Sequence, residues 1–183
     1  MATASVEDLA RACIAVGDLI ADVRADQWTA PTPCNEWNVR DVVNHLVAGN
    51  LVFASRIDDG PMPERGEDHL DNDPVGAYRA SAASLQAAFA RPAVLERSYP
   101  GPFGSATGAE LLQIRLYDLL THGWDLMQAT GIRAQIPEEL AEQALAFVRD
   151  QLSTQPRTRR FAEPQSVDGT APAIDRLAAF LGR

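Results

Sequence analysis

A chain of 183 residues is long enough for one domain with a real core, and its 46% hydrophobic and 22% charged residues exclude a disordered or fibrous protein. Its formal net charge of -9 disfavours nucleic-acid binding, which depends on concentrated cationic side chains. No apolar run approaches the roughly 20 residues that span a bilayer, and the N-terminus lacks the basic start and apolar stretch of a signal peptide. We therefore expect a cytoplasmic protein that does not enter a membrane.

The cysteines and the basic residues indicate no special site. Two cysteines without CxxC spacing predict neither a disulfide framework nor a cysteine-based zinc site. All 16 basic residues are Arg, a bias that fits a GC-rich genome. The one basic cluster, at Arg157, Arg159 and Arg160, lies in a segment with Pro and Thr and is typical of solvated surface.

The first periodic segment places apolar residues alternately three and four positions apart, as in a bundle helix with one narrow buried face. These residues are Val6, Leu9, Cys13, Val16, Ile20 and Val23. The spacing predicts a helix from about Ser5 to Arg24, with Cys13 in the core. A loop rich in Pro and Thr follows over 28–36, and a second helix begins within 35–38.

The second helix carries a histidine within its apolar face. That face reads Val39, Val42, His45, Leu46, Gly49, Val52 and Phe53. Residues 58–74 hold so many Pro, Gly and acidic residues that they predict an exposed loop. We expect His69, within this loop, to lie at the surface.

A third and a fourth helix are predicted from about 75 to 90 and from 109 to 130. Asp73-Pro74 supplies an N-cap and a proline at the first helical position of the third. Gly131 is placed to close the fourth helix at its C-terminus.

The rest of the chain predicts shorter elements. Pro137 opens a helix that ends near Leu152, residues 155–172 read as loop, and residues 174–181 can form a short terminal helix. No alternating segment is long enough to predict a useful strand. The expected fold is an all-α, four-helix bundle with additional short C-terminal helices, forming a single domain over 1–183.

Two residues of the fourth helix suggest a metal site. Asp118 and His122 are four positions apart and therefore lie on one helix face. A carboxylate and an imidazole are suitable ligands for a divalent ion, and His45 on a facing helix can be the third. Three protein ligands leave one position open, as in catalytic sites. A hydrogen-bonded core histidine and a chance Asp/His pair remain the alternative from spacing alone.

Residues near these candidates allow two interpretations each. Asp125, three positions after His122, is either a further ligand or a hydrogen-bond partner that orients one. Trp37 and Trp124 either line a pocket or pack in the bundle, and packing is the expectation.

Three other side chains likewise allow two interpretations each. Arg40 and Arg115 either bind an anionic substrate or pair with carboxylates inside the bundle. Cys34 is either a reactive thiol or a packed loop residue, and we expect the packed residue.

Two segments carry a family resemblance. Residues 32–46 (TPCNEWNVRDVVNHL) and 122–131 (HGWDLMQATG) resemble the ligand-bearing motifs of the DinB/YfiT-like metalloenzyme superfamily, and in particular the N-terminal domain of actinobacterial, mycothiol-dependent maleylpyruvate isomerases. Asp73-Pro74 and Asp175-Arg176-Leu177 also fit, so the resemblance spans nearly the whole chain.

The resemblance implies a four-helix bundle that holds a metal with His, then Glu or His, then His. His45 and His122 match the outer ligands of that set. The middle ligand falls on Asp118, whose side chain is shorter than Glu, so a water-bridged contact is an alternative to direct ligation.

The resemblance also implies a function. It suggests a divalent metal, with zinc or nickel favoured, and a thiol such as mycothiol that acts with a small-molecule substrate in a transferase or isomerase reaction. Such isomerases carry a further C-terminal domain, so the specific isomerisation is not predicted here. The competing hypotheses are a non-catalytic bundle that binds a small molecule or a protein, and an interaction module that forms a homodimer.

Overall fold

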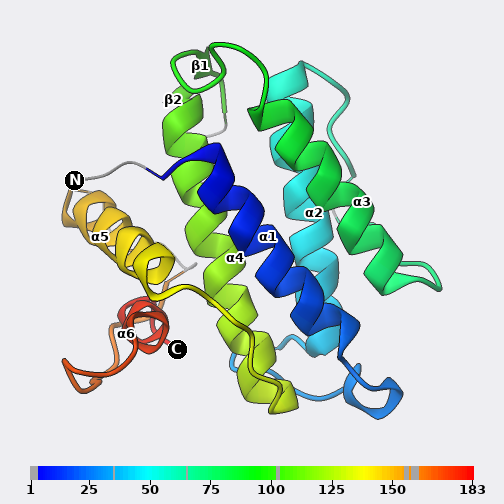
Figure 1. Ribbon diagram of the computed structural model, residues 1–183, viewed down its shortest axis with the longest axis vertical. Helices are drawn as coiled ribbons and strands as arrows, with labels where there is room; N and C mark the ends of the chain where they lie inside the picture. Colours follow the sequence, from blue (N-terminus) through cyan, green and yellow to red (C-terminus); the bar gives the residue numbers. More distant parts are fainter. Residues whose placement is uncertain (1–3, 35, 65, 102–103, 155–156, 158–160) are drawn as a thin grey trace.

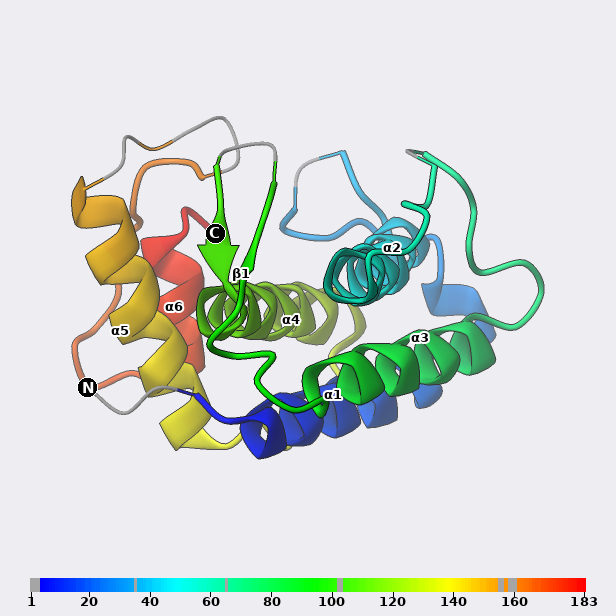
Figure 2. The ribbon, with the colours of Figure 1, turned by 90° about the horizontal axis from the view of Figure 1, so that it is seen from above.

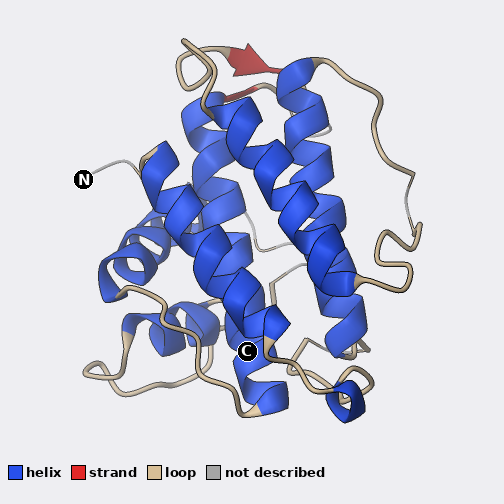
Figure 3. Ribbon diagram, turned by 45° about the vertical axis from the view of Figure 1, so that its right-hand side comes forward, coloured by secondary structure: helices blue, strands red, loops and turns tan. Residues whose placement is uncertain are grey.

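The computed structural model describes residues 4–34, 36–64, 66–101, 104–154, 157 and 161–183, and it is mainly helical (Figure 3). The elements are α1 (Val6–Ala21), the 3-10 helix η1 (Ala25–Gln27), α2 (Val39–Asp58), α3 (Pro74–Phe89), β1 (Ser98–Tyr99), β2 (Ala106–Thr107), α4 (Gly108–Thr130), α5 (Glu138–Thr154) and α6 (Ala173–Phe180). The prediction of an all-α fold is confirmed.

Four helices form the bundle. Helix α1 packs against α3 and α4, and α2 packs against the same two helices, so that the four enclose one core. Helices α5 and α6 pack against each other and against α4, on the side away from α2 (Figure 1, Figure 2). Helix α4 is therefore the central element, with neighbours on both of its sides.

Helices α2 and α3 run in the same direction. Arg40, in the first turn of α2, donates to the carbonyl of Asp71, just before α3, at 3.1 Å. Arg56, in the last turn of α2, donates to the carbonyl of Pro100, beyond the far end of α3, at 2.7 Å. The connection 59–73 must therefore return along the whole length of α2, as Figure 1 shows. This long return places polar loop residues beside the middle of α2.

The sequence fixes the helix ends through side-chain caps. The side chains of Ser5, Asn38 and Thr107 each accept from the backbone N–H of the acidic residue three positions on. The side chain of that acidic residue accepts in return from the backbone N–H of the capping residue, an arrangement called a capping box. Asp73 caps α3 with Pro74 at its first position, as predicted. Gly131, with φ of 72°, ends α4 in the left-handed conformation that glycine adopts without strain.

The core is built from aliphatic side chains of all four bundle helices. Its fully buried members include Leu9, Val16, Ile20, Val42, Leu46, Leu85, Leu112, Leu116 and Leu119. Each such side chain contributes about 1.5–3 kcal/mol through its removal from water. Cys13 is 3% exposed, which confirms its predicted place in the core.

Some predicted details differ from the structure. Helix α1 ends at Ala21 rather than near Arg24, and the 3-10 helix η1 follows it. The residues before α4 form an antiparallel pair of strands, β1 and β2, which are too short to show an alternation of apolar and polar residues. Asn35, Arg159 and Arg160 lie outside the described residues. Within the described part of the chain, no helix combines the length and the apolar character needed to cross a membrane.

Candidate metal centre

The structure brings His45, Asp118 and His122 together. Asp118 lies between the two imidazoles: its Oδ1 is 3.4 Å from Nε2 of His45 and 3.7 Å from Nε2 of His122. The ring centroids of the two histidines are 4.7 Å apart. Residues on α2 and α4 that are far apart in the sequence therefore converge, because these helices pack directly on each other.

The donor set fits a divalent ion. One donor atom from each of the three residues lies within 4.8 Å of the others. Ligands at about 2.0 to 2.1 Å from a tetrahedral zinc ion stand about 3.3 Å apart, so small side-chain movements would close the set around one ion. Two imidazoles and one carboxylate leave a fourth position free, as in catalytic zinc sites.

A carboxylate fixes the orientation of His122. Its Nδ1 lies 3.0 Å from Oδ2 of Asp125, which is fully buried. Because a carboxylate only accepts hydrogen bonds, Nδ1 donates to Asp125, and this orientation of the ring turns Nε2 toward Asp118. Asp125 is thus the hydrogen-bond partner of a candidate ligand, the second of its two predicted roles.

Arg183 extends this chain of contacts. Nε of Arg183 donates to both oxygens of Asp125, at 2.9 and 3.2 Å. Arg183 follows α6, which packs against α4 near this point. The guanidinium compensates the charge of the buried Asp125 carboxylate, so α6 supports His122 through two polar contacts.

The second oxygen of Asp118 is held by Arg115. This arginine, one turn earlier on α4 and 1% exposed, donates from Nη1 to Oδ2 of Asp118. Partial burial raises the pKa of the Asp118 carboxyl, but the two histidines and Arg115 outweigh that effect and hold the pKa well below its usual range. Asp118 is therefore an anion whose Oδ2 accepts from Arg115 and whose Oδ1 faces the two histidines.

Arg115 is itself tied into the core by a polar network. It donates to the carbonyl of Leu46 at 2.8 Å and to the side chain of Asn50 at 3.0 Å, and Asn50 donates to Ser81 at 3.0 Å. The network fits because residue 49 is glycine: a Cβ there would stand 2.5 Å from Nη1 of Arg115. Carboxylate pairing, one of the two predicted roles of Arg115, is what the structure contains.

The two tryptophans have different surroundings. The Trp37 ring lies 4.9 Å from the His45 ring and 5.7 Å from the His122 ring, so it covers the histidine pair. Trp124 instead donates to Asp175 on α6 at 2.7 Å and lines a separate cavity of about 440 Å³. Packing was expected for both, and Trp37 in addition borders the candidate site.

His69 is not the surface residue that the loop composition predicted. Its side chain is 10% exposed, because Asn44 on α2 accepts from the His69 backbone N–H at 2.8 Å and draws the loop inward. Asn44 also donates to the carbonyl of Glu67 at 3.0 Å. The composition of the loop gave no sign of these backbone contacts to α2.

A second donor group shares His122. Cys34, His122 and Asp125 also place donor atoms within 4.8 Å of one another. In that group Asp125 already accepts from the imidazole and from Arg183. Burial raises the pKa of the Cys34 thiol, and it raises that of Cys13 to about 11, so neither cysteine has the character of an activated nucleophile.

Comparison with known proteins agrees with the resemblance carried by the two motifs. The family model of the mycothiol maleylpyruvate isomerase N-terminal domain matches residues 9–127. Uncharacterized proteins from two strains of Mycobacterium tuberculosis are each 37% identical to this chain over 175 residues, which is 94% of this chain and 94% of each relative.

Solved structures extend the comparison to the fold. Crystal structures of the mycothiol-dependent maleylpyruvate isomerase, and of a mutant of it, superpose with a TM-score of 0.65 at 16% sequence identity, over 88% of this chain and 78% of theirs. At this identity the likeness concerns the fold. The family match, which includes the three candidate ligands, and the extent of the mycobacterial similarity lead to one conclusion: this chain belongs to the mycothiol maleylpyruvate isomerase N-terminal domain family.

Proposed function

We propose that this protein binds a divalent metal ion, zinc or nickel, through His45, Asp118 and His122, and that it uses a small thiol, mycothiol, in a transferase or isomerase reaction on a small molecule. The observation that carries the proposal is the position of Asp118 Oδ1 between two imidazole nitrogens, at 3.4 and 3.7 Å. Membership of the family supports the choice of thiol.

The residues around the site have matching roles. An ion at this position would lower the pKa of a thiol that binds in the open position, so that the nucleophilic thiolate is available at neutral pH. Asp125 holds His122 with Nε2 toward the site, and Arg115 holds Asp118 as an anion. The Trp37 ring lies against one side of the histidine pair.

The charges within the site favour an anionic ligand. The negative charge of Asp118 is already balanced by Arg115, which is 1% exposed. A divalent ion there would keep most of its charge uncompensated by the protein. A thiolate is an anion of the right chemistry to balance it.

Metal content tests the proposal. We expect close to one equivalent of metal in the wild-type protein and less than about a tenth of that in a His45→Ala/His122→Ala variant, because one remaining carboxylate cannot hold the ion. Elemental mass spectrometry on untagged protein, after reconstitution with zinc or nickel, measures both. His69→Ala is the matched control, since it removes the third histidine and leaves the candidate ligands intact.

The thiol is tested on the same samples. Calorimetric titration with mycothiol should show binding to the metal-loaded protein and none after treatment with a chelator. Equal metal content in the wild type and the double variant would refute the ligand assignment. Absence of metal from the wild type as well as from both variants would favour the non-catalytic bundle.

A further inference from the structure

A cavity of about 330 Å³ lies beside the candidate metal centre, between α2 and the returning loop. The lining residues that matter here are Trp37, Asp41, His45, Glu64, Glu67 and His69. His45 and Trp37 belong both to this cavity and to the histidine cluster. Its volume is within the range of small-molecule sites, so it is a suitable place for the part of a ligand that extends away from the ion.

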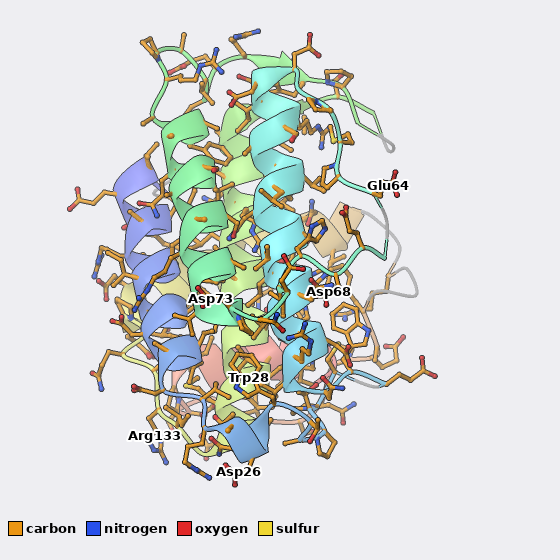
Figure 4. All side chains as sticks on the ribbon, turned by 90° about the vertical axis from the view of Figure 1, so that its right-hand side faces the viewer. Asp26, Trp28, Glu64, Asp68, Asp73 and Arg133 are labelled. Carbon is orange, nitrogen blue, oxygen red and sulfur yellow. The ribbon has the colours of Figure 1, made fainter. Side chains whose placement is uncertain are left out.

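The described lining of this cavity is negatively charged. Asp41, Glu64 and Glu67 contribute three carboxylates, and none of the described lining residues is an arginine. Figure 4 shows Glu64 on the loop outside α2. Arg40, near Asp41 on α2, is already paired with Asp68 at 2.8 Å. Glu67 lies 4.0 Å from Nδ1 of His69, whereas Asp41 and Glu64 have no cationic partner among the described side chains.

A buried polar atom independently indicates a ligand. Nε2 of His69 is buried and has no hydrogen-bond partner among the described residues, although the side chain is only 10% exposed. A buried imidazole nitrogen without a partner costs about 1–3 kcal/mol. His69 lines the cavity through other atoms of its side chain, so a rotation of its ring would bring this nitrogen to a polar group of a bound molecule.

We infer that this cavity receives the end of the ligand farthest from the metal and selects against a negative charge there, so that neutral or cationic groups are bound in preference to carboxylates. The inference rests on the proposed function. The two ends of the site would then differ in charge: the ion attracts the thiolate, while Glu64 and Glu67 repel an anionic tail. The indole of Trp37 can in addition bind a quaternary ammonium group.

Three thiols of the same length test the inference. Thiocholine, 2-mercaptoethanol and 2-mercaptoethanesulfonate differ in the charge of the tail, which is positive, zero and negative. Their dissociation constants from the cobalt-loaded protein can be measured through the sulfur-to-cobalt absorption band. We expect affinity in that order, and about a tenfold smaller preference for thiocholine over the sulfonate in a Glu64→Gln/Glu67→Gln variant at low salt.

Comparison of the two proteins removes the influence of the thiols themselves. Differences in thiol pKa affect both proteins equally and cancel in the ratio of their preferences. Asp26→Asn/Glu163→Gln is the matched control, because it removes two carboxylates that do not line the cavity and should leave the preference unchanged. An unchanged preference in the Glu64→Gln/Glu67→Gln variant would overturn the inference, whereas failure to bind cobalt or any thiol would overturn the proposed function.

Discussion

Replacement of Arg115 by Met is expected to lower the free energy of unfolding by about 3–5 kcal/mol, the usual cost of breaking a buried ion pair from one side. The change leaves the Asp118 carboxylate without its guanidinium partner, and it leaves the Leu46 carbonyl and the Asn50 side chain without their donor. Urea denaturation followed by circular dichroism measures the loss. A loss below about 1 kcal/mol would show that the network contributes little to stability.

Gly49 provides an independent test of the same network. In the interior of a helix, Gly→Ala normally stabilises by about 1 kcal/mol. At position 49 we expect the opposite sign, a loss of about 1–3 kcal/mol, because the new methyl group would stand 2.5 Å from Arg115. Gly169→Ala is the control: no atom lies within 4 Å of the added methyl, so stability should stay within about 0.5 kcal/mol.

The sequence predicts local features of the fold well, because they depend on neighbouring residues. The apolar spacing of α1, the Asp73-Pro74 start of α3 and the Gly131 end of α4 each involve residues within a few positions of one another. The i, i+4 pair of Asp118 and His122 is equally local. These predictions are confirmed as structure, while metal binding itself stays a prediction.

Apart from the approach of His45 to Asp118 and His122, the features that the sequence does not predict are contacts between distant residues. Arg183 meets Asp125 from 58 positions away, and Arg115 meets Asn50 from 65 positions away. The inward position of His69 likewise depends on Asn44, on another element. One signal was present: Asn50 is a polar residue on the buried side of α2, and buried polar side chains need partners. The identity of such a partner requires the packing of the helices.

Replacement of Asp125 is expected to weaken metal binding by about tenfold for Asn and by up to about 100-fold for Ala, the usual effect of losing a partner that orients a metal-binding histidine. The Asn side chain can still accept from Nδ1 of His122, but it lacks the negative charge that makes Nε2 of the imidazole a stronger metal ligand. The Ala side chain leaves both Nδ1 and Arg183 without their shared acceptor. Competition with a chromophoric zinc chelator measures the affinity, and far-ultraviolet circular dichroism shows whether each variant is folded.

Asp175→Asn separates orientation of the ligand from general loss of packing. Asp175 also accepts from a ring N–H, that of Trp124 at 2.7 Å, but it contacts neither candidate histidine. We expect replacement of Asp175 to leave zinc affinity unchanged within about twofold. Arg183→Gln should weaken zinc affinity less than Asp125→Ala does, because Asp125 would still hold His122. Equal loss of affinity in Asp175→Asn and Asp125→Asn would contradict the orienting role, since it would mean that any weakening of the contact between α4 and α6 disturbs the site.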